Sequence, residues 1–586
     1  MTWKMVTDPL GNIGLSALLS ALPIFFLFWA LAVKRMKGHW AAICSTAIAV
    51  AVAIVGYGMP ASLALLSTFN GMLFGLWPVA WIVITAVFIY NLSVKTGEFE
   101  IIKNSLASIS DDRRMQALLI AFSFGAFLEG AAGFGTPVAI SAAMLAGLGF
   151  SPIYAAGICL LANTAPVAFG AIGIPIIVAG QVSGVDSMAI SQMAGRTLPF
   201  LSVIVPLYLV ILMSGWKKGM EVWPAALVSG GSFAIAQFLS ANYLGPMLPD
   251  ILASIASIIC LVVFLQFWHP KESWRFAHEA ASEGREKLKY TGGQVFRAWT
   301  PFILLSIFVA AWGIQSIKDV LDYFSLFKLQ IPGLHNMVLR GDKPVAAVYA
   351  FNLLSAGGTA ILLAGLFSVP VMGASARTAM DVAGQTLKSL RWPIFTISMI
   401  LGFAYIMNFS GMATTLGLAF AATGKIFPFF APFLGWLGVF MTGSDTSTNA
   451  LFGKLQEVTA TKIGVDPVIT VSANTCGGVC GKMISPQSIA VATAATGNVG
   501  KEGDIFRFTL KHSLLLTTFI AVMAYLQAYV IKWIVPVYDK AATVAAPAKA
   551  AFNPAMGATC LAIALAAVVA ITLSARIAGK GKPSMA

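Results

Sequence analysis

The chain has 586 residues, of which 58% are hydrophobic and only 10% are charged, and its mean hydropathy is +0.85. An ordinary soluble domain is about 25% charged, so this composition excludes a soluble globular protein and indicates a polytopic membrane protein. The formal net charge of +14 does not indicate nucleic-acid binding, because Lys and Arg of membrane proteins gather in cytoplasmic loops and fix the orientation there.

Thirteen apolar segments have about the length needed to cross the hydrocarbon core of a bilayer. In chain order they are 12–33, 40–58, 77–94, 153–180, 196–214, 221–240, 247–267, 299–317, 345–369, 392–409, 467–490, 512–534 and 555–574. Two further apolar stretches, 118–150 and 426–453, are broken near the middle by Gly, Ser, Thr or Asn into arms of about 11 to 13 residues. Because such arms are too short to span, both stretches are predicted to be re-entrant hairpins.

The distribution of basic residues tests this layout. With the N-terminus outside, 24 of the 37 Lys and Arg residues fall in segments predicted to be cytoplasmic, 10 fall outside, and 3 lie in or beside crossings. This excess follows the rule that Lys and Arg gather on the cytoplasmic side. It holds only if each hairpin returns to the side from which it enters, so that the first opens from inside and the second from outside.

A repeat relates the two halves of the chain. The stretches ANTAPVAFGAIGIP (162–175) and ANTCGGVCGKMISP (473–486) share Ala, Asn, Thr, Gly and Pro at the same spacing. Upstream, FLEG ends at Gly130, 32 residues before Ala162, and FMTG ends at Gly443, 30 residues before Ala473. Together with the opposite entry of the hairpins, this predicts an inverted repeat, as in many secondary transporters with sites near the midplane.

The predicted fold is therefore an all-α polytopic inverted-repeat secondary transporter with two re-entrant hairpins and discontinuous helices. The first half, 1–268, contains the hairpin 118–150 and the broken helix 153–180. A cytoplasmic linker, 269–298, follows. The second half, 299–586, contains the hairpin 426–453, the broken helix 467–490 and the C-terminal helices.

Four stretches carry a resemblance to a known family. GAFLEGAAGFGTPVAI, ANTAPVAFGAIGIP, TGSDTSTNALFG and ANTCGGVCGKMISPQSIAVA resemble the signature stretches of the L-lactate permease family, and the likeness runs over essentially the whole chain. The resemblance implies a multi-pass protein of the bacterial inner membrane that carries L-lactate, D-lactate or glycolate together with protons. No cofactor and no metal site is expected, and the partners are a small monocarboxylate, protons and the lipid bilayer. The oligomeric state and the preferred substrate stay open.

The paired Asn-Thr motifs also resemble the Ser-Asn-Thr motifs of divalent-anion/sodium symporters, although Ala replaces Ser here. A sodium-coupled organic-anion transporter therefore remains an alternative. An enzyme is disfavoured because the five histidines lie in loops or at the ends of crossings and neither HExxH nor GxSxG occurs. A channel would not require inverted hairpins with a buried carboxylate.

Glu129 lies in a run of Gly, Ala, Phe and Leu at the predicted tip of the first hairpin. A carboxylate at membrane depth is costly when ionised, so it can bind a proton and release it when a gate admits water. Glu129 is therefore predicted to carry the coupled proton. The alternative is a static role, in which it pairs with a basic residue or caps the hairpin backbone.

Two further charged residues are expected at membrane depth. Asp445, at the mirrored tip, is the second candidate proton site, although its Ser and Thr neighbours could keep it ionised. Lys482 is the only basic residue that lies well inside a predicted crossing, and it follows the expected break at Gly481. Lys482 either neutralises Asp445 or Glu129 in the empty carrier or meets the substrate carboxylate.

A small anion that leaves water needs backbone N–H groups, helix N-termini or a cation to replace its hydration. Gly130, Gly133 and Gly135 would let the backbone approach a ligand, and a helix starting near Thr136 would aim N–H groups at it. The alternative for each glycine is close helix packing. The remaining predicted substrate-binding groups are the polar side chains of Asn163, Thr164, Ser444, Thr446, Asn474 and Thr475.

Overall fold

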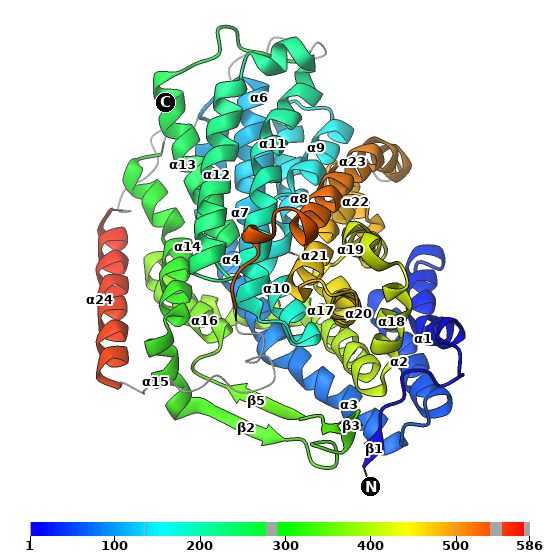
Figure 1. Ribbon diagram of the computed structural model, residues 1–586. Coiled ribbons are helices and arrows are strands. Elements are labelled where there is room, and N and C mark those ends of the chain that lie inside the picture. The colour runs from blue at the N-terminus through cyan, green and yellow to red at the C-terminus, as the bar shows by residue number, and fades with distance from the viewer. Residues whose placement is uncertain (1, 134, 277–289, 499, 539–553, 579–586) are drawn as a thin grey trace.

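The computed structural model describes residues 2–133, 135–276, 290–498, 500–538 and 554–578, and the chain in these ranges is mostly helical (Figure 1). The first-half helices are α1 (Ile13–Phe28), α2 (Gly38–Ala51), α3 (Ala61–Phe74), α4 (Trp81–Lys95), α5 (Glu98–Ala107), α6 (Arg113–Gln116), α7 (Gly125–Ala131), α8 (Thr136–Gly147), α9 (Pro152–Ala162), α10 (Gly170–Ser183), α11 (Ser187–Met220), α12 (Trp223–Tyr243) and α13 (Pro249–Phe267). The second-half helices are α14 (Gly292–Gly313), α15 (Gln315–Ser325), α16 (Gly357–Val371), α17 (Ala376–Ser410), α18 (Met412–Ala421), α19 (Phe427–Thr442), α20 (Asp445–Ile463), α21 (Pro467–Lys482), α22 (Pro486–Ala495), α23 (Glu502–Tyr529) and α24 (Pro554–Ala578).

Short 3-10 or π-helical segments and five short strands complete the described secondary structure. The helical segments are η1 (Trp29–Val33), η2 (Val52–Gly56), η3 (Gly75–Ala80), η4 (Ala117–Phe124), η5 (Val167–Phe169), η6 (Gly424–Ile426) and η7 (Lys532–Ile534). The strands are β1 (Trp3–Lys4), β2 (Leu326–Gln330), β3 (Val338–Arg340), β4 (Lys343–Pro344) and β5 (Val348–Asn352). Strands β2 and β5 form an antiparallel pair, while β3 pairs with both β1 and β4.

The polytopic helical fold is confirmed. Among the described residues, eleven helices are long and apolar enough to cross a membrane, or twelve if the bent pair α9 and α10 is one span. One of the eleven is α19, an arm of the second predicted hairpin, so eleven of the thirteen predicted crossings are found when the bent pair is included. The other two predicted crossings are interrupted. The predicted crossing 345–369 begins in the strand β5, so its helix α16 has only 15 residues. The predicted crossing 467–490 is divided into α21 and α22.

Three helical regions differ from the prediction. The helix α3 precedes the predicted crossing 77–94 and was missed, and the helix breaks at Trp77 before α4 begins. The predicted crossing 392–409 is the last part of the 35-residue helix α17. The short helix α18 follows it and was also missed. Polar residues such as Ser67, Thr68 and Asn70 hid α3, yet they are buried against neighbouring helices rather than exposed to lipid.

Both hairpins are present, but three of their four arms are longer than predicted. The first hairpin runs without a break through α6, η4 and α7, from Arg113 to Ala131, and returns in the 12-residue helix α8. The second consists of the 16-residue α19 and the 19-residue α20, which pack on each other and meet at Gly443 and Ser444. Helix α20 contains many polar and charged residues, so hydropathy did not indicate its full length.

The two halves of the chain interlock in space. Helices α2 and α3 pack on α17, α1 packs on α18, and α10 packs on α20. Figure 1 shows the N-terminal helices beside the second-half helices α17, α18 and α20. Residues 277–289 of the predicted linker lie outside the described residues, and α14 begins at Gly292, within the predicted C-terminal end of that linker.

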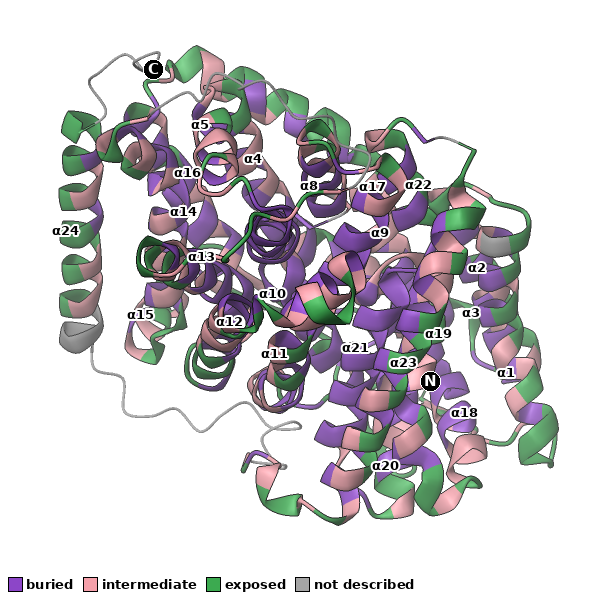
Figure 2. Cartoon of the chain, turned by 90° about the horizontal axis from the view of Figure 1, so that it is seen from above, coloured by how far each residue is buried: buried purple, intermediate pink, exposed green. Residues whose placement is uncertain are grey.

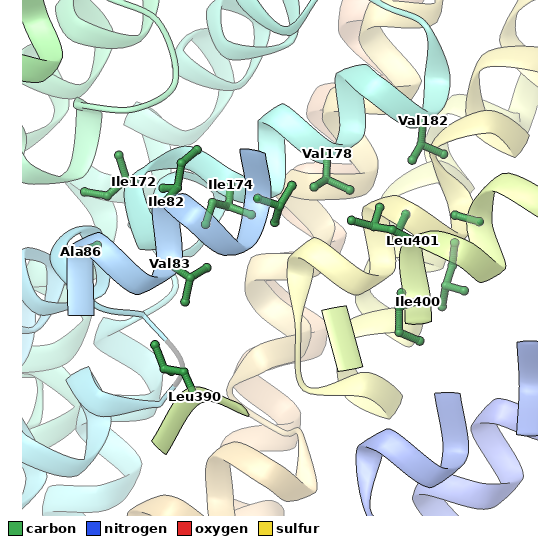
Figure 3. Packing of buried hydrophobic residues seen from close by; sticks show 14 of the residues in the cluster. Ile82, Val83, Ala86, Ile172, Ile174, Val178, Val182, Leu390, Ile400 and Leu401 are labelled. Carbon is green, nitrogen blue, oxygen red and sulfur yellow. The ribbon is translucent and has the colours of Figure 1, made fainter. Parts of the chain in front are cut away.

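Buried side chains concentrate at the centre of the bundle, where α9, α10 and α21 lie, whereas α24 at the edge shows much exposed surface (Figure 2). Figure 3 shows Ile174, Val178 and Val182 of α10 between Ile82 of α4 and Leu401 of α17. Apolar packing thus fixes the second part of the bent pair on both sides.

Contacts at the helix ends agree with the predicted sidedness. Arg114, fully buried, donates to Asp112 at 2.7 Å, to the Lys218 carbonyl at 2.7 Å and to the Glu272 carbonyl at 3.0 Å. Three segments predicted to be cytoplasmic therefore meet. The pairing of β1 with β3 places the N-terminus beside the 326–352 region, and both were predicted to lie outside.

This arrangement predicts the labelling of single cysteines by a membrane-impermeant maleimide. Cysteines that replace Ser151, the N-cap of α9, and Arg377, in the first turn of α17, are expected to react only from the cytoplasm. A cysteine that replaces His335, between β2 and β3, is expected to react only from outside. Reaction of either of the first two from outside would contradict the inverted layout.

Candidate functional site

A buried ion pair joins the two halves of the chain at the centre of the bundle. Glu129 of α7 accepts a hydrogen bond from Lys482 Nζ at 2.6 Å through Oε1 and one from Asn163 Nδ2 at 3.0 Å through Oε2. The side chains of Glu129 and Lys482 are only 3% and 9% exposed. A buried pair of opposite charges avoids the large penalty that either charge would meet alone.

Interruptions of two helices place the partners of Glu129. Asn163 is the C-cap of α9, and the chain then unwinds until α10 resumes a regular helix after Gly173. Ala171, Ile172 and Gly173 adopt left-handed conformations with φ of 45°, 58° and 70°. A left-handed conformation costs about 1–2 kcal/mol for each non-glycine residue, so tertiary packing must hold this segment. Lys482 is the last residue of α21, and α22 starts at Pro486.

The break of the second repeat follows Lys482, next to Gly481, where the sequence placed it. Asn474 and Thr475, however, were expected at this break, and they lie inside the continuous helix α21. In the first repeat the break follows directly after Asn163. Glycines explain the difference: Gly477 and Gly481 let α21 lie against the backbone of α19 at Pro432 and Trp436, where a side chain would overlap. That contact keeps α21 helical.

A second polar cluster surrounds Asp445, the first residue of α20. Asn449 Nδ2 donates to the hydroxyl of Thr475, to the Pro175 carbonyl at 3.1 Å and weakly to Asp445 Oδ2 at 3.5 Å. Asn474 Nδ2 donates to Asn449 Oδ1 at 2.8 Å. Gln456 Nε2 extends the network to Asn474 Oδ1 at 3.1 Å. These side chains are all buried, so α20 and α21 are joined by amides rather than by apolar contacts.

One face of α21 connects the ion pair to this cluster. Thr475, Gly478 and Lys482 follow one another at helical spacing, and the carboxylate of Asp445 lies against Gly478. Four residues of helix rise by roughly 6 Å, so Asp445 and the Glu129–Lys482 pair are about one helical turn apart along α21. The two acidic residues that the sequence singled out are therefore brought into one site.

A third carboxylate, Asp250, belongs to the same site and was missed. It lies in the first turn of α13 and is 1% exposed, and a Cβ atom added to Gly130 would stand 2.7 Å from its own Cβ. Neither oxygen of Asp250 has a hydrogen-bond partner. The sequence does mark this residue, because Asp250 is the one Asp, Glu, Lys or Arg between Glu221 and Lys271. Asn449 and Gln456 were also missed, although they stand in the polar run that follows Gly443.

The other predicted site residues fall into two groups. Gly130 packs on Asp250, Gly133 faces Ala171 of the unwound segment, and Gly135 has a φ of +83° beside Val491 of α22. Around these glycines the hairpin tip thus approaches α10, α13 and α22. The side chain of Thr136 lies outside the described part of the structure.

Three hydroxyl residues take local positions. Thr164 donates to the Leu161 carbonyl at 2.6 Å, Ser444 caps α20 by accepting from the Ser447 N–H at 3.2 Å, and Thr446 is half-buried in the first turn of α20. Their roles in substrate binding stay predictions.

The chain matches known permeases over most of its length. The sequence profile of the L-lactate permease family matches residues 16–531. The chain is 53% identical over 563 residues to the L-lactate permease of Bacillus subtilis (strain 168), covering 92% of this chain and 100% of that one. It is 51% identical over 552 residues to the glycolate permease GlcA of Escherichia coli (strain K12), covering 90% of this chain and 99% of that one. Among solved structures it is similar to MtrF of Neisseria gonorrhoeae, with a TM-score of 0.44 and 13% identity over 80% of this chain and 85% of that chain.

The close contact between α19 and α21 gives a stability prediction. Replacing Gly477 by Ala should destabilise the protein by about 1–3 kcal/mol, because the added methyl group overlaps the Pro432 carbonyl and forces α21 away from α19. Thermal unfolding in detergent would measure the loss. The matched control is Gly231→Ala on α12, where nothing lies within 4 Å of the added Cβ atom, and it should unfold at the wild-type temperature or above.

Proposed function

The chain belongs to the L-lactate permease family and is a multi-pass inner-membrane transport protein, and on that premise we propose that it is a proton-coupled symporter of small 2-hydroxymonocarboxylates. The observation that carries the proposal is the buried contact of 2.6 Å between Lys482 and Glu129. The named relatives support the substrate class, since an L-lactate permease and a glycolate permease are nearly equally similar to the chain. L-lactate is the proposed main substrate, with D-lactate and glycolate as further ones.

The ion pair couples an anion to a proton by exchange of partners. In the empty carrier, the Lys482 ammonium is neutralised by Glu129. When the substrate carboxylate takes that ammonium, Glu129 loses its counter-charge while it stays buried, so it binds a proton. The anion and the proton therefore enter together, and the net charge of this part of the site is the same before and after loading.

The remaining contacts follow from the chemistry of a 2-hydroxy acid. Asn163 Oδ1 is buried and has no hydrogen-bond partner, so it is free to accept a bond from the 2-hydroxyl group. The hairpin tip at Gly130, Gly133, Gly135 and Thr136 would bring backbone N–H groups to the carboxylate. The proposed substrate contacts of the second half are Ser444, Thr446, Asn474 and Thr475 beside Asp445.

Asp445 is the alternative proton site. Its Oδ1 atom is buried and has no hydrogen-bond partner, while Oδ2 accepts only a long bond from Asn449. A proton on Asp445 would leave Glu129 with the static role of holding Lys482. Sodium in place of the proton is the second alternative, because the Asn-Thr motifs resemble those of sodium symporters.

Uptake into proteoliposomes separates proton from sodium coupling. With an inward proton gradient and no sodium, L-lactate and glycolate are expected to accumulate above the external concentration. A protonophore should abolish this accumulation, and adding sodium at fixed pH should not change it. Uptake that requires sodium at fixed pH would overturn proton coupling.

The variant Glu129→Gln tests the exchange mechanism. Because Gln imitates the protonated side chain, the loaded carrier should still bind substrate and reorient, whereas the empty carrier should fail to return, since it would bury the Lys482 ammonium without Glu129. Gradient-driven accumulation should therefore be lost while substrate-for-substrate exchange continues at a substantial rate. Both rates are measured in the same proteoliposomes.

Three further variants complete this test. Glu129→Ala should lose both activities through altered packing of the hairpin, and Asp445→Asn is the comparison at the mirrored tip. Lys482→Ala should weaken substrate binding in exchange about 10- to 100-fold, as expected when a charge-assisted hydrogen bond of about 1.5–3 kcal/mol is lost. Accumulation at the wild-type level in Glu129→Gln would exclude Glu129 as the proton carrier and leave Asp445 in that role.

A further inference from the structure

Asp250 is a buried acid without a partner, next to the residue that the proposed mechanism protonates. It is 1% exposed, and both of its carboxylate oxygens are buried without a hydrogen-bond partner. It packs against Gly130, the neighbour of Glu129 in α7, with the Cβ position of Gly130 2.7 Å from the Asp250 Cβ. The absence of a side chain at Gly130 is what allows α13 to come this close.

Few charged groups face Asp250. Helix α13 packs against α12, α7, η4 and α10. Of these elements, α7 contributes Glu129, α12 contributes only the exposed Tyr243, and η4 and α10 contain no titratable residue. The ammonium of Lys482 on α21 donates its hydrogen bond to Glu129 at 2.6 Å. The acid of α7 beside the Gly130–Asp250 contact is therefore a carboxylate whose counter-ion is already engaged.

An ionised carboxylate that is buried with no donor in reach is far costlier than a neutral carboxyl group. Three of the buried carboxylates described here lie near one ammonium: Glu129 pairs with Lys482, Asp250 lies against Gly130, and Asp445 lies against Gly478. Ionisation of all three would leave this region with two uncompensated negative charges at membrane depth. Glu129 is the carboxylate that the ammonium neutralises, so Asp250 holds a proton in this state.

Asp250 lies on the side of Glu129 that is remote from the cytoplasmic helix ends. The helix that carries Glu129 begins at Arg113, whose N–H donates to the Trp274 carbonyl at 3.1 Å, beyond the far end of α13. From Arg113 to Ala131 the helix rises about 28 Å, which is nearly the thickness of the hydrocarbon core. The turn that precedes Asp250 reaches the surface at Leu244, which is 44% exposed.

We propose, building on the symport function above, that Asp250 is the proton relay through which Glu129 is protonated from the non-cytoplasmic side. When the substrate carboxylate takes Lys482, the O–H bond of Asp250 breaks and its proton forms the O–H bond of Glu129, directly or through one water molecule. Asp250 is left as a carboxylate and takes a new proton from hydronium of the non-cytoplasmic solution, which reaches the site when the substrate enters. One proton is thus bound for each substrate, and Asp250 ends as it began.

A relay changes the rate of protonation but not the number of protons carried. The variant Asp250→Asn keeps the shape of the neutral side chain and cannot transfer a proton. The initial rate of uptake driven by an inward proton gradient should fall at least about 10-fold, the lower range of the effect of a positioned acid–base group. The final accumulation ratio should equal that of the wild type.

Controls separate this role from a structural one. Asp186→Asn keeps an N-cap of α11 outside the site and should transport at the wild-type rate. Asp250→Glu should recover part of the uptake rate, because it restores a transferable proton. Infrared spectra at neutral pH should show a protonated-carboxyl band in the wild type that Asp250→Asn lacks, a readout that does not depend on transport.

Each other outcome overturns the relay. A wild-type uptake rate in Asp250→Asn means that the proton of Asp250 does not move, and a lowered final accumulation ratio means that Asp250 is itself a stoichiometric proton site. Absence of the infrared band means that Asp250 is ionised. If the wild type itself needs sodium and ignores pH, the symport proposal fails, while the infrared result still reports the state of Asp250.

Discussion

The salt bridge between Lys482 and Glu129 constrains the rest of the structure. Breaking a buried ion pair by removing one partner costs about 3–5 kcal/mol, because the remaining charge is left without compensation at membrane depth. Lys482 therefore has a carboxylate beside it at every stage at which it is enclosed by protein. A carrier built around such a pair admits an anion only when the displaced acid is neutralised. Under the proposed symport mechanism, coupling between substrate and proton follows from the burial of this ion pair.

This pair exists only because two helices end at the centre of the bundle. Asn163, which donates to Glu129, is the C-cap at the break between α9 and α10. Lys482 is the last residue before the break between α21 and α22. The breaks are held by packing from outside the site: Pro246 covers Gly173 of the left-handed segment, and α19 supports α21 along Gly477 and Gly481. Contacts that have no part in binding thus hold the strained backbone of the broken segment in place. Strained backbone at functional sites generally persists only where the surrounding structure holds it in this way.

The sequence predicted the membrane class, both hairpins, the repeat and two of the three acids, since each leaves a mark in composition or spacing. It did not predict α3 or the short α18, because hydropathy cannot distinguish a polar residue buried between helices from one that ends a span. Lys482 was expected to neutralise Asp445 or Glu129 or to meet the substrate, and the choice of Glu129 needed coordinates, as the two residues are 353 positions apart. Asp250 was overlooked although it is as isolated in its apolar segment as Glu129, because it was placed at the edge of a crossing where charge is unremarkable.

The two repeats use the same Ala-Asn-Thr motif in different ways, and this difference makes the two halves of the site unlike in charge and in hydrogen bonding. In the first repeat the helix stops at the motif, so Asn163 turns to Glu129 and leaves its Oδ1 atom unused. In the second repeat the helix continues for seven residues after Thr475, so Asn474 is occupied by Asn449 and Gln456, and the helix end carries Lys482 instead. Here one acid lies beside a cation and the other lies among amides and hydroxyls, so in the proposed mechanism Glu129 is the acid that exchanges its counter-ion with an incoming carboxylate.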